Sequence, residues 1–154
     1  MDGTICALPD LIKVLERHVP HRNTRHILVD EAHGAGVYGQ GGRGVCNALH
    51  CHVSARLVTF GKAFGCAGAV LLVPVLWREY LLNYARPLIY STALPPSQAA
   101  AIDVVISAWE RGEMEAAVQM LHTRVAELYT ALGLRSDAAL PPAPIVQVRS
   151  AHAK

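Results

Sequence analysis

Two short stretches decide the fold of this chain: residues 27–34, ILVDEAHG, and residues 57–65, LVTFGKAFG. Each is an apolar run typical of a buried strand, and each ends at a chemically capable group, Asp30 in the first and Lys62 in the second. Ligands of open α/β sheets bind beyond the carboxyl ends of the strands. The two stretches therefore predict one pocket that Asp30 and Lys62 both face.

The rest of the chain reads as helices and strands around that pair. Strands are expected over residues 26–30, 56–60 and 67–73, and extended pieces over residues 87–90 and, after three prolines, 145–148. Apolar periodicity predicts helices over residues 9–19, 76–84, 97–111 and 113–132, with Gly133 as the final stop. This order of elements indicates an α/β fold whose apolar sheet is covered by helices.

A glycine-rich loop, residues 34–44, joins the first two expected strands. Its spacing matches neither the dinucleotide-binding pattern G-x-G-x-x-G nor a Walker sequence, so a phosphate-binding loop is the weaker interpretation. Glycines also allow sharp turns and close backbone approach. We interpret the loop as a tight connection beside the pocket.

Composition limits the classes of function. The 154 residues are 52% hydrophobic and 17% charged, which predicts a folded core. A net charge of +2 does not favour nucleic acid or an anionic membrane as a partner. The longest apolar run, residues 66–77, is too short to span a bilayer. Neither nucleic acid nor a membrane is therefore expected as a partner.

The four cysteines are Cys6, Cys46, Cys51 and Cys66, and none forms a C-x-x-C pair. This usage favours a reducing compartment. We expect the cytoplasm, with a mitochondrial or peroxisomal location left open. Cys46, His50, Cys51 and His52 crowd together, but their spacing fits no standard zinc finger and the segment reads as a surface loop, so no metal is predicted.

Pyridoxal 5'-phosphate is the cofactor that asks for a lysine and a carboxylate together. Lys62 would hold its aldehyde as a Schiff base, and Asp30 would keep its ring nitrogen protonated. His33 would hydrogen-bond the phenolate oxygen of the ring or move a proton, and Thr59 would offer its hydroxyl to the phosphate. Taken singly, each residue is more often a cap, a turn residue or a solvated side chain. The combination carries the hypothesis.

A rival interpretation uses the same letters, because residues 30–33, DEAH, match the box of nucleic-acid helicases that handles magnesium and ATP. That activity requires an upstream Walker A sequence, G-x-x-x-x-G-K-[ST]. The only Gly-Lys pair, Gly61-Lys62, lies downstream and is followed by Ala63. A DEAH-box-like ATPase is kept as a remote alternative.

Four motifs together resemble the α-oxoamine synthases, pyridoxal-phosphate enzymes of the aminotransferase class I/II, fold type I. The motifs are DEAHG at residues 30–34, GRG at 42–44, TFGKAFG at 59–65 and STALPP at 91–96. The resemblance implies that residues 1–140 are part of the large cofactor-binding domain, with a mainly parallel sheet covered by helices. Residues 141–154 would then be a linker and the start of the small domain.

The resemblance also implies roles for individual residues. Lys62 matches the Schiff-base lysine, Asp30 the partner of the pyridine nitrogen, and His33 the histidine near the phenolic oxygen. Thr59 matches a contact of the phosphate or of the lysine region. Ser91 and Thr92 match a segment that reaches the cofactor phosphate of the other subunit in a homodimer.

The reaction implied by the family joins an amino acid to an acyl-CoA with loss of carbon dioxide, and Lys62 would take up or return the α-proton. Residues 32–34 and 91–96 most resemble the members that use alanine and pimeloyl-CoA in biotin synthesis. Residues 61–66 are also similar to the 5-aminolevulinate synthases.

The chain departs from the family by its length. The upstream segment that stacks on the cofactor and the downstream arginine that binds the substrate carboxylate have no counterpart in it. We therefore expect a fragment of a longer chain. The alternative is a non-catalytic remnant or subunit that pairs with a full-length homologue.

Overall fold

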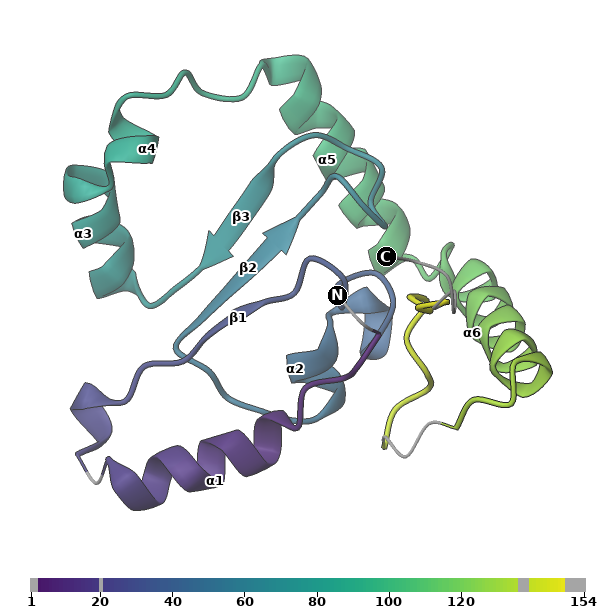
Figure 1. Ribbon diagram of the computed structural model, residues 1–154. Helices are drawn as coiled ribbons and strands as arrows, with labels where there is room; N and C mark the ends of the chain where they lie inside the picture. Colours follow the sequence, from purple (N-terminus) through teal and green to yellow (C-terminus); the bar gives the residue numbers. More distant parts are fainter. Residues whose placement is uncertain (1–2, 20, 136–138, 149–154) are drawn as a thin grey trace, which may run out of the picture. The chain divides into compact units, whose positions relative to one another are not determined.

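The computed structural model describes residues 3–19, 21–135 and 139–148 and divides the chain into two compact units. One unit is Leu8–Glu113, and the other combines residues 3–7 with the residues from 114 onward. The elements of the first unit, labelled in Figure 1, are α1 (Leu8–His18), η1 (Arg22–Thr24), β1 (Leu28–Asp30), η2 (Gln40–Gly42), α2 (Val45–Ala48), β2 (Ala55–Thr59), β3 (Ala69–Leu72), α3 (Val75–Tyr84), α4 (Arg86–Ile89) and α5 (Pro96–Glu110).

The sheet of this unit has the strand order β1-β2-β3, with β1 parallel to β2 and β2 antiparallel to β3 (Figure 1). Parallel neighbours need a long crossover, which residues 31–54 supply between β1 and β2. The link from β2 to β3 is short and closes with the Phe60 N–H donating to the Gly68 carbonyl at 2.9 Å. The predicted α/β class is confirmed, and β3 makes this three-stranded sheet mixed.

The strands are less covered than their apolar runs predict. Leu28 on β1 is 59% exposed and Leu72 on β3 is 41% exposed. The buried core instead gathers around the glycine-rich loop and the segments that pack on it. Its members in this unit are Leu8, Ala35, Val37, Tyr38, Cys46, Ala55, Phe60, Cys66 and Trp109.

Most predicted helices of this unit are confirmed to within two residues. In α1, Asp10 lies in the first turn and Arg17 in the last, where each charge opposes the nearer end of the helix dipole. α5 begins with Pro96 at its first position, where the missing N–H has no intrahelical role.

Two local predictions for this unit are wrong. Residues 87–90 were expected to be extended, but Arg86–Ile89 forms α4, because Pro87 lies in the first turn, where proline is tolerated. The segment around Cys46 was expected to be a surface loop, but Val45–Ala48 forms α2 and Cys46 is buried.

The second unit is built on α6 (Glu115–Ala131), with Val125 and Ala143 buried. Gly133 follows α6 as predicted, and the Leu134 N–H donates to the Tyr129 carbonyl at 2.9 Å, which closes a Schellman turn. The strand expected over residues 145–148 is absent: these residues are described without strand pairing, and an extended segment becomes a strand only beside a partner.

No helix in the described ranges is both long enough and apolar enough to cross a membrane.

Candidate functional site

The parallel pairing of β1 with β2 brings two strand ends to one edge of the sheet. Asp30 is the last residue of β1 and pairs with Leu57, while Thr59 is the last residue of β2. Lys62 follows Thr59 by three residues and His33 follows Asp30 by three. The four side chains predicted to form one site therefore stand on the two segments that leave this edge.

Asp30 is exposed and holds the turn that follows β1. Its Oδ1 accepts the backbone N–H of Ala32 at 2.8 Å. The structure gives its Oδ2 no hydrogen-bond partner in the described part of the chain. Asp30 thus acts as a turn residue and still offers one carboxylate oxygen to a ligand.

Lys62 lies in a tight turn after β2, and its side chain is exposed. The Gly65 N–H donates to the Lys62 carbonyl at 3.0 Å, and the Cys66 N–H donates to the Phe60 carbonyl at 2.7 Å. The backbone of the turn is therefore well fixed.

Thr59 uses its hydroxyl inside the same turn. Its Oγ1 accepts the Gly61 N–H at 3.3 Å and lies 3.4 Å from the Gly68 carbonyl, to which it donates. His33 is exposed at the start of the glycine-rich loop, whose following residues are buried. Both side chains lie at the carboxyl edge, and neither of their proposed roles is tested by these contacts.

Glu31 is the residue at this edge that the sequence interpretation missed. It is 1% exposed, and its two carboxylate oxygens accept the backbone N–H groups of Val45 at 2.9 Å and Cys46 at 2.7 Å. Those N–H groups open α2, so the carboxylate satisfies donors that a helix start leaves unpaired. Gly44, at φ 93°, passes so close that a Cβ there would lie 2.7 Å from Glu31 Oε2.

Strand alternation is the signal that would have found Glu31. Successive side chains of a strand point to opposite faces, so an exposed Asp30 implies an inward Glu31. The inward carboxylate needs donors, and the start of α2 supplies them. Through these two hydrogen bonds Glu31, which directly follows Asp30, holds the far end of the glycine-rich loop.

Ser91 and Thr92 stand apart from this group. They lie in the irregular segment between α4 and α5, and both are exposed. Across the described ranges, neither side chain hydrogen-bonds to Asp30, Thr59 or Lys62. Their implied role at the cofactor of another subunit stays a prediction.

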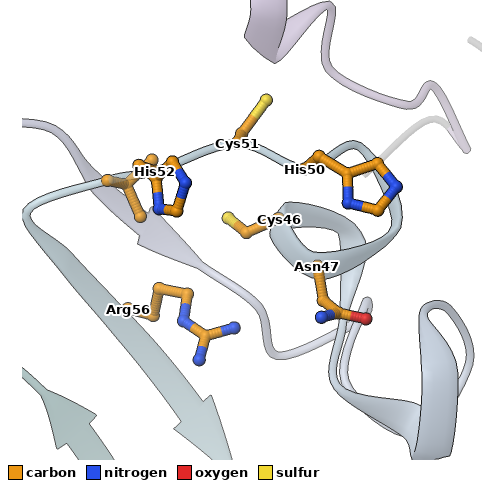
Figure 2. A pocket seen from close by; sticks show the side chains of 7 residues that line it. Cys46, Asn47, His50, Cys51, His52 and Arg56 are labelled. Carbon is orange, nitrogen blue, oxygen red and sulfur yellow. The ribbon is translucent and has the colours of Figure 1, made fainter.

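The cysteine and histidine cluster noted in the sequence lines a pocket of about 310 Å³ beside α2, at the amino end of β2. Figure 2 shows Cys46 and Arg56 beside this hollow, with the Cys51 sulfur directed away from the Cys46 sulfur. The lining residues are Cys46, Asn47, His50, Cys51, His52, Val53 and Arg56. In the described residues no three His, Cys, Asp or Glu side chains are arranged to hold a metal ion.

Cys46 is chemically quiet in this pocket. Burial, followed by a hydrogen bond and charge repulsion from the Glu31 carboxylate, raises the pKa of the Cys46 thiol to about 12. Burial also raises the pKa of Cys51. Because the thiolate is the reactive form, neither thiol is an activated nucleophile.

Comparison with known proteins gives a consistent result. A family profile described as aminotransferase class I and II matches residues 1–152. An 8-amino-7-oxononanoate synthase of Yersinia pestis (strain Pestoides F) is 48% identical over 105 residues, which make up 68% of this chain and 27% of that protein. The chain thus matches only about a quarter of the length of this curated relative.

Solved structures show the same likeness. The crystal structure of 8-amino-7-oxononanoate synthase from Francisella tularensis is 32% identical with a TM-score of 0.71, over 92% of this chain and 41% of that chain. A structure described as SPT with PLP internal aldimine is 26% identical with a TM-score of 0.73, over 92% of this chain and 35% of that chain.

Proposed function

The chain belongs to the aminotransferase class I and II family, and from this membership we propose that it carries part of the pyridoxal-phosphate site of an α-oxoamine synthase. The observation that carries the proposal is the parallel pairing of β1 with β2. It brings a carboxylate, Asp30, and an amine, Lys62, to segments that leave the same edge of the sheet.

The groups at this edge fit the cofactor by their chemistry. Lys62 offers an exposed amine for an aldehyde, and Asp30 offers a carboxylate oxygen without a partner in the described residues for a protonated ring nitrogen. The hydroxyl of Thr59 is a donor suited to phosphate or to the lysine turn. His33 is an exposed imidazole, able to donate to a phenolate oxygen.

The bound cofactor would supply an electron sink for the charge that develops at the substrate α-carbon. Lys62 Nζ would accept the proton that leaves that carbon and return it later in the cycle. Asp30 would hold the ring nitrogen in its protonated form, since a carboxylate beside a cation stabilises the charge. His33 would orient the ring through its oxygen.

The reaction we propose is the condensation of an amino acid with an acyl-CoA, with loss of carbon dioxide. The similarity to the 8-amino-7-oxononanoate synthases of Yersinia pestis and Francisella tularensis supports this class of reaction. That enzyme is also the specific member of the class that we favour. Alanine and pimeloyl-CoA, used in biotin synthesis, are then the proposed substrates. The helicase alternative gains no support, because residues 1–152 as a whole match the aminotransferase family.

We further propose the arrangement of the larger protein. Residues 1–140 would belong to the cofactor-binding large domain, and residues 141–154 would begin the small domain. Of the latter, residues 149–154 lie outside the described residues.

A homodimer is the proposed assembly, in which Ser91 and Thr92 would reach the phosphate bound to the other subunit. Exposed apolar side chains on α3 and α4 support it; they include Val75, Leu76, Tyr80, Tyr84, Leu88 and Ile89. The same face also favours the second candidate, a non-catalytic subunit that pairs with a full-length homologue. Turnover by a self-contained homodimer would reject that second candidate.

A cytoplasmic location is part of the proposal. The mitochondrial or peroxisomal alternative is not borne out, because relatives such as those of Yersinia pestis and Erwinia tasmaniensis are bacterial proteins.

Covalent mapping of the cofactor tests the proposal. The chain is incubated with pyridoxal phosphate, reduced with borohydride, digested and mapped. Its only lysines are Lys13, Lys62 and Lys154. We expect the label on Lys62, together with a visible absorption band that the Lys62→Arg variant lacks and that Lys13→Arg keeps.

Equal labelling of Lys13 and Lys62 would overturn the proposal, because it would show that Lys62 reacts only as an ordinary surface amine.

A further inference from the structure

Trp109, in the last turn of α5, is buried between two functional segments of the same unit. On one side its ring packs against Phe64, with ring centroids 5.7 Å apart. Phe64 in turn packs edge-on against Phe60 at 5.7 Å. Aromatic pairs at such distances add to the stabilisation from burial. Trp109 is thus tied through Phe64 to the turn that carries Lys62.

On its other side, Trp109 lies against the glycine-rich loop that continues from Asp30 and His33. A Cβ at Gly42 would lie 2.5 Å from Trp109 Cζ3, and one at Gly36 would lie 3.4 Å from Trp109 Cζ2. The Gly36 N–H donates to the Gly42 carbonyl at 2.8 Å, so the two contacts belong to one closed loop. Only the absence of a side chain at Gly42 lets the indole lie this close to the loop.

The Lys62 turn and the glycine-rich loop also lie close to each other next to the indole. A Cβ at Gly36 would collide with the side chain of Ala63, the residue after Lys62. Past the ends of β1 and β2, the Lys62 turn and the loop after His33 therefore approach each other at Gly36. Ala63 and Trp109 both lie next to Gly36, and this close packing sets the distance between the two segments.

We propose that Trp109 is a positioning residue that holds the Lys62 turn at a fixed distance from the loop that follows Asp30 and His33. This inference rests on the proposed function, because it takes Lys62 and Asp30 as cofactor contacts. As a positioning residue, Trp109 would act through its contacts with Phe64, Gly36 and Gly42.

The indole acts by shape. Its Nε1–H is buried and has no hydrogen-bond partner in the described part of the chain. Replacement by phenylalanine therefore removes no hydrogen bond and keeps an aromatic ring beside Phe64. Replacement by alanine removes the contacts on both sides at once.

The test compares Trp109→Ala, Trp109→Phe and Val104→Ala in the borohydride experiment. Val104 is the control, because it lies on the same helix as Trp109 but is 65% exposed. The readout is the ratio of label on Lys62 to label on Lys13. In any variant that loses its fold, this ratio moves toward one.

We expect Trp109→Ala to lower this ratio about tenfold, because small displacements of a reacting group cost large factors in rate. Trp109→Phe should restore most of it, and Val104→Ala should leave it unchanged. An unchanged ratio in Trp109→Ala, or an equal loss in Val104→Ala, would overturn the inference.

Hydrogen exchange separates this inference from the proposed function. If Lys62 is not labelled in the unsubstituted chain, the proposed function fails, and the inference is decided by the amides of Gly36, Gly65 and Cys66. Each donates to a carbonyl within one of the two segments. Trp109→Ala should weaken the protection of all three together. Loss confined to one segment, or no loss, would overturn the coupling.

Discussion

Two regions of the unit Leu8–Glu113 differ sharply in how they are held. The loop after β1 is fixed by this chain itself: Glu31 is 1% exposed and Tyr38 is 5% exposed. The segment of α3 and α4 is open, with Leu76 79% exposed and Tyr90 78% exposed. Proposed cofactor contacts lie in the first region and directly after the second, yet only the first region has its geometry set by contacts among the described residues.

This contrast identifies the part of the proposed site whose geometry is set within the described residues. Four of the proposed contacts lie on segments whose turns are held by hydrogen bonds and flanked by buried residues. They are Asp30, His33, Thr59 and Lys62. Ser91 and Thr92 follow an apolar face that includes a pocket of about 570 Å³, lined by Leu76, Trp77, Tyr80 and Leu81. Exposed apolar surface of this kind supports the homodimer that we propose.

We expect the largest loss of stability from a substitution that disrupts the loop after β1. Glu31→Ala leaves the N–H groups of Val45 and Cys46 buried without an acceptor, so we expect the free energy of unfolding to fall by about 3 kcal/mol. Urea denaturation measures it. The control Glu79→Ala removes an exposed carboxylate paired with Arg78 and should cost less than about 1 kcal/mol. Equal costs would mean that Glu31 does not anchor the loop.

The free energy of unfolding should also depend on pH through the buried Cys46 thiol, which lies at the end of the same loop. The pKa of Cys46 rises from 9.0 to about 12 on folding, so the unfolded chain loses this proton first. The contribution to stability is complete below pH 9 and is lost as the pH rises toward 12. We expect the free energy of unfolding to fall less steeply over this range in Cys46→Ala than in the unsubstituted chain.

Cys6→Ala is the control for that measurement, because Cys6 is exposed. It should follow the unsubstituted chain throughout the range. If Cys46→Ala shows the same slope as Cys6→Ala, the Cys46 thiol does not contribute to the alkaline loss of stability.

The smallest expected effect concerns the open region. Leu76→Ser replaces a side chain that is already in solvent, so the free energy of unfolding should change by less than about 0.5 kcal/mol at low protein concentration. Sedimentation velocity should show weaker self-association. A loss of several kcal/mol, as expected for the buried Leu8→Ala, would show that this face is covered within the chain.

The sequence predicts the elements that depend on local pattern. Apolar periodicity and terminal signals identified α1, α3, α5 and α6, and the two apolar runs identified β1 and β2. It failed where tertiary contacts decide. α2 is a single turn whose first N–H groups are capped by Glu31, fourteen residues away from Val45, and no local pattern reveals that. The exposed sheet faces likewise depend on what covers them.

The candidate site shows the same division. The strand ends and their parallel order were predicted, and so the shared edge of Asp30 and Lys62 followed. Glu31 was missed because the acidic pair was interpreted through Asp30 alone. Trp109 was missed because its partners, Phe64 and Gly42, are distant in the sequence.

The central claim is that Asp30 and Lys62 act on one bound pyridoxal phosphate. A double-mutant cycle tests it most directly: the dissociation constant of the cofactor is measured by equilibrium dialysis for the unsubstituted protein, Asp30→Asn, Lys62→Ala and the double variant. We predict a coupling free energy of at least about 1 kcal/mol, as found for groups that share a ligand. Losses of affinity that add to within about 0.3 kcal/mol would contradict the account, because they would show two groups acting independently.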